Sequence, residues 1–172
     1  MRVVVIEPPQ RVVSASAAKA AKVFSADDGD AYVNLLLDVA QAEIDGPNAW
    51  LGRSLGEQVL ETTMPAACEV DTSMLPFPPF VSIVSNTVSD DGNTRTVRWN
   101  AGYVDGEIPA PIRHAIIMMA GQLRDAVPSD DGAIKRKTVD GVGSWEYSLP
   151  DGAAAAMKAA AERLLAPYRV YR

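Results

Sequence analysis

The sequence predicts an α+β fold, mainly a helical bundle with an inserted β-hairpin region. Near both ends of the chain, apolar residues recur at three- and four-residue steps, which indicates amphipathic helices. Between these segments, a proline-rich stretch leads into apolar–polar alternation around a tight turn signal. The βαβ alternation of a parallel sheet is absent. The 172 residues show no repeat and no linker, so residues 1–172 are expected to form one domain.

The N-terminal segment combines one strand with two helices. Residues 2–6 are mostly β-branched and are followed by prolines, which predicts a short strand. Ser14 or Ser16 can cap an Ala-rich helix that runs through Phe24. A second helix is expected to follow the acidic turn 25–28 and to end near Ile44. Its predicted apolar face carries Tyr32, Leu35, Leu36 and Val39.

The middle of the chain is predicted to form strands and a hairpin. Residues 55–64 and 68–74 are expected to be short strands separated by Pro65. Residues 81–87 alternate apolar and polar side chains, as a half-exposed strand does. The turn signal at residues 90–93 contains Asp-Gly, which readily adopts the positive φ values of a hairpin turn. Residues 94–99 would then form the returning strand.

The most apolar helix of the chain is predicted between Pro109 and Val127. Proline is tolerated only in the first helical turn, so Pro109 and Pro111 place the helix start near residues 109–112. Apolar residues cover most of the helix circumference, which is typical of burial on more than one side. This helix is therefore either the centre of the domain or partly covered by a neighbouring subunit. The residues assigned to this core or interface surface are Ile112, Ile116, Ile117, Met118, Met119 and Leu123.

The C-terminal segment is predicted to contain a polar excursion and a last helix. Val127 and Pro128 end the apolar helix, and the Gly-bearing residues 129–142 form a loop or a projecting hairpin. Asp151 can cap a helix over residues 153–165. Its expected buried stripe consists of Met157, Ala160, Ala161 and Leu164. Pro167 ends this helix, which leaves residues 168–172 as a projecting tail.

Composition excludes several classes of protein. No run of about 18 apolar residues is present, and the N-terminus lacks the features of a signal peptide. One cysteine excludes an internal disulfide and suits a reducing compartment. A net charge of −6 argues against a protein that grips nucleic-acid phosphates, which requires a basic surface. It is compatible with a protein that lines a passage for DNA.

The titratable residues give no sign of catalysis. His114 is the only histidine, and a packed or interfacial role is favoured because no partner nucleophile is evident. Cys68 lacks the signature of a reactive cysteine. Asp27, Asp28 and Asp30 lack calcium-loop spacing and suit a helix N-terminus. We expect no enzyme, no metal and no cofactor. A small ligand-binding or enzyme domain built on carboxylates remains an alternative.

Two clusters suit contacts with other macromolecules. Lys135, Arg136 and Lys137 belong either to a solvated loop or to a contact with an acidic neighbour or DNA. The C-terminal tail combines tyrosine with arginine, which are residue types enriched at interface anchors. It is either a tail that reaches a partner or a disordered end. The tail consists of Tyr168, Arg169, Val170, Tyr171 and Arg172.

The order of several short motifs resembles the head–tail connector (adaptor) proteins of long-tailed bacteriophages and gene transfer agents. Residues 99–103 (WNAGY) are followed by residues 108–113 (IPAPIR) and the long apolar helix. The paired helices of residues 17–44, the segment 75–80 (LPFPPF) and the segment 164–169 (LLAPYR) lie in the expected order. Two regions depart from the family pattern. Relatives more often carry an aromatic residue and a Glu within residues 122–125, and the segment 129–145 is long and charged.

This resemblance implies a structural virion protein that forms a ring, commonly of twelve subunits, between portal and tail. The ring joins head to tail and extends the DNA channel. By this analogy, the tail 168–172 docks on the portal protein and the apolar helix makes subunit contacts. The hairpin 81–99, or the loop with Lys135, Arg136 and Lys137, faces the next tail component.

The implied partners are further copies of the chain, the portal protein, and a stopper or other neck protein of the tail. DNA would pass through the channel without specific binding, because twelve acidic copies repel phosphates. No membrane is involved. The protein would lie at the head–tail junction of the virion after assembly in the bacterial cytoplasm. Another tail-junction component, either a stopper or a tail terminator, is the alternative.

Overall fold

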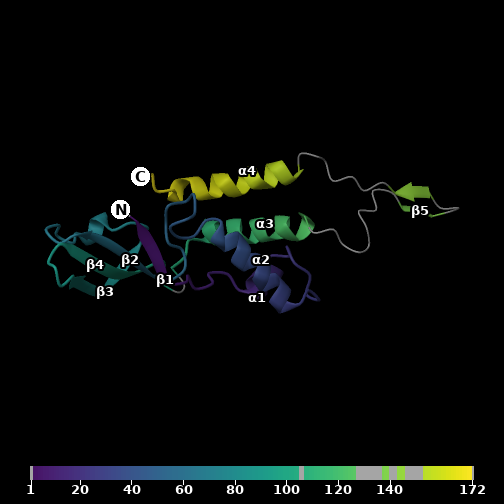
Figure 1. Cartoon of the computed structure of the whole chain (residues 1–172). Coiled ribbons are helices and arrows are strands. Elements are labelled where there is room, and N and C mark those ends of the chain that lie inside the picture. The colour runs from purple at the N-terminus through teal and green to yellow at the C-terminus, as the bar shows by residue number, and fades with distance from the viewer. Residues whose placement is uncertain (1, 105–106, 127–136, 140–142, 146–152, 172) are drawn as a thin grey trace.

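A computed structural model describes residues 2–104, 107–126, 137–139, 143–145 and 153–171 (Figure 1). The helices and strands, in chain order, are β1 (Val3–Glu7), α1 (Ala15–Ala20), α2 (Asp30–Ala42), β2 (Gln58–Pro65), the 3₁₀ helix η1 (Thr72–Met74), β3 (Phe80–Val88), β4 (Thr94–Ala101), α3 (Ala110–Ala126), β5 (Lys137–Val139), β6 (Gly143–Trp145), α4 (Ala153–Leu165) and the 3₁₀ helix η2 (Ala166–Tyr168).

The prediction of a mainly helical bundle with an inserted hairpin is wrong. The described chain is a mixed fold in which a four-stranded antiparallel sheet, ordered β1-β2-β4-β3, lies beside four helices (Figure 1). The N-terminal strand causes the difference, because β1 pairs with β2 across more than fifty residues of sequence. Periodicity identifies a strand but not its distant partner. The hairpin is therefore one half of a sheet and not an insertion.

The predicted hairpin turn is confirmed. β3 and β4 are joined at residues 89–93, where Gly92 has a φ of +72°. The Asp91 carboxylate accepts hydrogen bonds from Ser89 and from the Asn93 backbone N–H. The strand predicted at residues 68–74 is wrong, because Asp71 accepts a hydrogen bond from the Ser73 N–H and begins η1.

The two faces of the sheet differ in chemistry. One face packs a small core in which Trp99 lies opposite Leu60, Val97 lies opposite Thr62, and Leu75 comes from the loop before β3. The other face is polar. There Arg98 donates to Glu61 at 2.5 Å, and Asn100 donates to Ser82 at 2.9 Å.

The helices form the larger core, with α3 packed against both α2 and α4 (Figure 1). α3 begins at Ala110, as the two prolines predict. Ile112, Ile116 and Ile117 are buried within the chain. The remaining predicted residues of this helix, Met118, Met119 and Leu123, are partly buried.

Two predicted helix faces require correction. α2 buries Val33, Leu36, Leu37 and Ala40, whereas three residues of its predicted face are exposed: Tyr32, Leu35 and Val39. Both stripes are apolar at helical spacing, so periodicity alone could not choose between them. In α4 the buried residues are Ala161 and Leu165, while Met157 is exposed.

A buried carboxylate connects the helical core to the sheet. Asp45, just beyond α2, accepts hydrogen bonds from the backbone N–H groups of Leu55 at 2.7 Å and Gly56 at 3.0 Å. The side-chain amides of Gln41 and Gln58 each donate to it at 2.8 Å. Burial raises the pKa of Asp45 above its ordinary value, although the four N–H donors act in the opposite direction. This carboxylate fixes α2 relative to the chain that enters β2.

Glycine makes the same junction compact. A Cβ atom at Gly56 would lie 2.0 Å from the carbonyl oxygen of Gln10, and one at Gly102 would lie 2.2 Å from that of Gly56. Three backbone segments therefore cross at a distance that no side chain would permit.

Candidate docking surface

The C-terminal tail is anchored to the turn at residues 51–53. The Val170 N–H donates to the Leu51 carbonyl at 2.9 Å, and the Arg53 guanidinium donates to the Tyr168 carbonyl at 3.0 Å. Gly52, with a φ of +69°, permits this contact because a Cβ there would lie 2.6 Å from the Val170 carbonyl oxygen. The tail thus has a defined path along the body through residue 171.

Arg169 lies between two exposed aromatic rings. Its guanidinium carbon is 5.4 Å from the centroid of the Trp50 ring and 4.8 Å from that of Tyr171. Both distances suit cation–π attraction. The ring of Tyr171 remains largely exposed at 78%, and Trp50 is also exposed. We call these three side chains the C-terminal stack.

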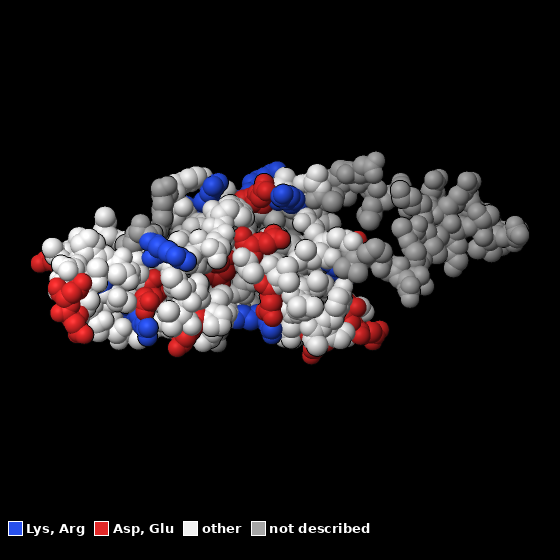
Figure 2. Space-filling model, viewed as in Figure 1, with Lys and Arg blue, Asp and Glu red and all other residues white. Residues whose placement is uncertain are grey.

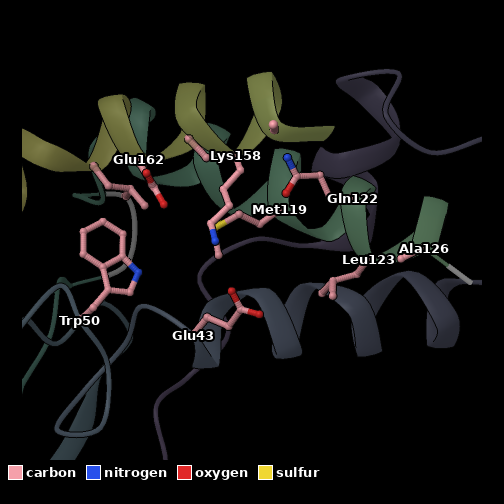
Figure 3. A pocket seen from close by; sticks show the side chains of 11 residues that line it. Glu43, Trp50, Met119, Gln122, Leu123, Ala126, Lys158 and Glu162 are labelled. Carbon is pink, nitrogen blue, oxygen red and sulfur yellow. The ribbon is translucent and has the colours of Figure 1, made fainter. Parts of the chain in front are cut away.

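A groove between α3 and α4 begins beside this stack (Figure 3). It is a hollow of about 490 Å³ with an apolar floor that includes Met119, Leu123 and Leu165. Glu43 from the end of α2 and Lys158 from α4 lie at its edge (Figure 3). We call this hollow the α3–α4 groove.

A second hollow of about 500 Å³ continues the groove to Arg169 and Tyr171. The two hollows share four lining residues: Glu43, Trp50, Lys158 and Glu162. An apolar floor with a charged edge is the arrangement that accepts an amphipathic helix from a partner. The surface therefore suits a protein contact that spans the groove and the stack.

His114, Cys68 and Asp45 do not line either of these two hollows. No group of three or more His, Cys, Asp or Glu side chains in the described part of the chain could hold a metal. His114 is exposed in the first turns of α3, and Cys68 is an exposed free thiol. The buried Asp45 carboxylate accepts hydrogen bonds from the surrounding N–H donors of the junction. Among the described helices, none is long and apolar enough to cross a membrane.

The predicted site residues fall in separate places. Arg169 and Tyr171 line the stack end of the groove, and the backbones of Tyr168 and Val170 bind the turn at residues 51–53. Arg172 lies outside the described residues. Lys137 begins β5, which pairs with β6, and Lys135 and Arg136 lie outside the described residues. The roles assigned to these residues remain predictions.

Sequence reasoning missed two important residues. Trp50 is not among the predicted site residues, yet it forms one side of the stack. Gly52, two residues further on, was the available signal, since an isolated glycine often marks a close backbone approach. Asp45 was overlooked because a single acidic residue after a helix is usually solvated.

The sequence matches no protein-family model and no curated protein. The fold, a mixed arrangement of helices and strands, nevertheless has a counterpart among solved structures. It is similar to that of a chain in the solved structure "Virion of native gene transfer agent (GTA) particle", with a TM-score of 0.59 and 14% sequence identity. The likeness covers 100% of this chain and 97% of that chain. The two chains therefore share a fold over nearly their whole lengths.

Proposed function

We propose that this chain is a structural protein of a phage or gene transfer agent virion. The observation that carries this proposal is the fold shared from end to end with a chain of a gene transfer agent particle. A structural role, in place of catalysis, is consistent with a surface that offers a groove and an aromatic stack. Such a protein assembles with other proteins of the virion.

Within the virion, we propose that the chain forms a ring between portal and tail. The ordered motifs at residues 75–80, 99–113 and 164–169 support this role, because they resemble those of head–tail connector proteins. A ring of such acidic chains would repel the phosphate backbone and allow DNA to slide through its channel. Acidic and basic side chains are interspersed over the face of the helices in Figure 2.

The C-terminal stack and the α3–α4 groove are the proposed portal-docking surface. Arginine and aromatic residues concentrate binding energy at interfaces, and here they lie beside an apolar floor. Removal of residues 168–172 is expected to leave the domain folded, because the helical core retains nearly all of its buried residues. The same truncation should abolish portal attachment. A truncated chain that still joins particles would refute docking through residues 168–172.

The ring hypothesis can be tested by electron microscopy of particles made without this gene. DNA-filled heads and free tails that fail to join are expected, and the wild-type gene supplied in trans should restore joining. Normal tailed particles would contradict the proposal.

A stopper or tail terminator is the second candidate, because such components contain strands and the described chain has a four-stranded sheet. These components tend to be rich in strands, however, so a chain with 38% helix and 21% strand suits a connector better. The two roles differ in the partner that is bound. A connector should bind isolated portal-containing heads, whereas a terminator should bind isolated tails. Mixing the purified chain with each preparation and sedimenting the particles distinguishes them.

A further inference from the structure

Both edges of the four-stranded sheet lack a partner strand in the described chain. β1 pairs only with β2, and β3 pairs only with β4. The outer N–H and C=O groups of an edge strand form a template for another strand. Proteins usually blunt such edges with lysine, proline or a covering helix.

Register irregularities protect part of each edge strand, but they leave Val3–Val5 of β1 and Asn86–Val88 of β3 regular. β1 and β3 contain no lysine and no proline. Their exposed side chains include several β-branched apolar residues, with Val4 at 44%, Val84 at 52% and Val88 at 49% exposure. Exposed valines on an unpaired strand favour pairing with a second strand.

The strand directions make the two edges complementary. All neighbours in the sheet are antiparallel, and three reversals separate β1 from β3, so these strands run in opposite directions. A copy placed beside the sheet by rotation would bring its β1 against β3 with the antiparallel alternation unbroken. This contact uses two different surfaces, so it repeats from copy to copy and can close into a ring.

Charge selects the same orientation. An antiparallel pairing places Arg2, just before β1, beside Asp90 and Asp91, just after β3. A parallel pairing would place Glu7 beside these aspartates. Opposite charges stabilise a cross-strand pair, and like charges destabilise it. Figure 2 shows acidic side chains gathered at the end of the sheet away from the helices.

The regular parts of both strands lie at these charged ends. The irregularities of β3 fall between Phe80 and Ile83 and between Ile83 and Ser85, which leaves Asn86–Val88 regular. The irregularity of β1 follows Val5. A register that pairs Val3 with Val88 and Val5 with Asn86 keeps the core-facing side chains on one face.

We propose that β1 of one copy pairs antiparallel with β3 of the next, so that the sheet continues from subunit to subunit. The inference rests on the proposed ring, and it names the surfaces through which neighbouring copies join. In this register Val4 lies opposite Thr87, and both point away from the sheet core.

Cysteine cross-linking tests the pairing. In a Cys68→Ser background, Val4→Cys combined with Thr87→Cys should give a ladder of disulfide-linked oligomers on a non-reducing gel. The matched control combines Val4→Cys with Val88→Cys, whose side chains lie on opposite faces, and should cross-link at least several-fold less. Both pairs are tested in assembled particles and in the concentrated purified chain.

The outcomes separate this inference from the proposed function. A ladder in either preparation supports the pairing, even if the chain is absent from particles and the proposed function fails. Products that stop at dimers overturn it, because pairing between two different edges must propagate. The absence of a cross-link in both preparations also overturns the pairing. In that case, particles that contain the chain would still support the proposed function.

A charge exchange provides a second test. Asp90 makes no hydrogen bond or ion pair within the described chain, so its replacement leaves the turn held by Asp91 intact. Arg2→Glu and Asp90→Lys should each reduce the cross-linked ladder several-fold, and the two together should restore it. Equal losses in the single and double variants would overturn the antiparallel pairing.

Discussion

The helical half and the sheet half of this molecule differ in how many apolar side chains they bury within the chain. Among the described residues, the helical core contains nineteen buried apolar residues and the sheet core contains five. α3 is covered on both sides, whereas the sheet keeps a polar face and two free edges. The helical half therefore supplies most of the stability that the chain has alone. The sheet half has more surface left for neighbouring subunits.

The largest effect is expected from a charge in the helical core. Ile116 is fully buried in α3, so Ile116→Asp should unfold the chain, with a loss above about 4 kcal/mol. Circular dichroism during urea unfolding measures this. A variant that stays folded but fails to assemble would show instead that this part of α3 is covered by another subunit.

A cavity in the sheet core should cost slightly less. Trp99 is fully buried, and Trp99→Ala is expected to destabilise the chain by about 3–5 kcal/mol. Because the two cores are separate clusters, the sheet signal in circular dichroism should be lost before the helical signal. Trp99→Phe is the milder control, since the indole N–H has no hydrogen-bond partner in the described chain. A single transition for Trp99→Ala would show that the cores unfold as one unit.

The junction between the halves should respond more weakly and depend on pH. Asp45→Asn leaves buried N–H donors without an acceptor and should cost about 2 kcal/mol. Burial raises the pKa of Asp45, so its stabilising contribution is complete below the unfolded-state value of about 4 and declines as pH rises through the folded-state pKa.

The cost of Asp45→Asn should therefore be largest in acid and shrink with rising pH. Asp38→Asn is the matched control, because Asp38 lies in α2 and forms an exposed ion pair with Arg11. Denaturant unfolding at several pH values measures both variants. A cost for Asp45→Asn that grows with pH would contradict the raised pKa.

The smallest effect on folding is expected at the C-terminal stack. Arg169→Ala removes two exposed cation–π contacts and should cost about 1 kcal/mol. Attachment to portal-containing heads should fall far more than stability does. An Arg169→Ala chain that sediments with these heads as well as wild type would exclude the stack from docking.

The sequence was sufficient for some local features, though not for the strand predicted at residues 68–74, and insufficient for the long-range arrangement. The prolines located the start of α3, and Asp-Gly located the turn between β3 and β4, because both signals act within a few residues. The pairing of β1 with β2 and the buried face of α2 depend on partners distant in sequence. Local patterns do not carry this information.

The same distinction between local pattern and long-range arrangement applies to the candidate site. The composition of residues 168–172 identified the tail as a contact element, since arginine and tyrosine are typical interface anchors. The association of Arg169 with Trp50 could not be read from the sequence, because it depends on the backbone contact between Val170 and Leu51. The order of the motifs suggested the proposed ring. The two unpaired sheet edges could be recognised only from the fold.

The central claim is that this chain lies at the head–tail junction. The most direct measurement is gold labelling of an epitope-tagged chain on intact particles, viewed by electron microscopy. Label confined to the junction between the head and the tail is expected. Label along the tail or over the capsid surface would contradict it.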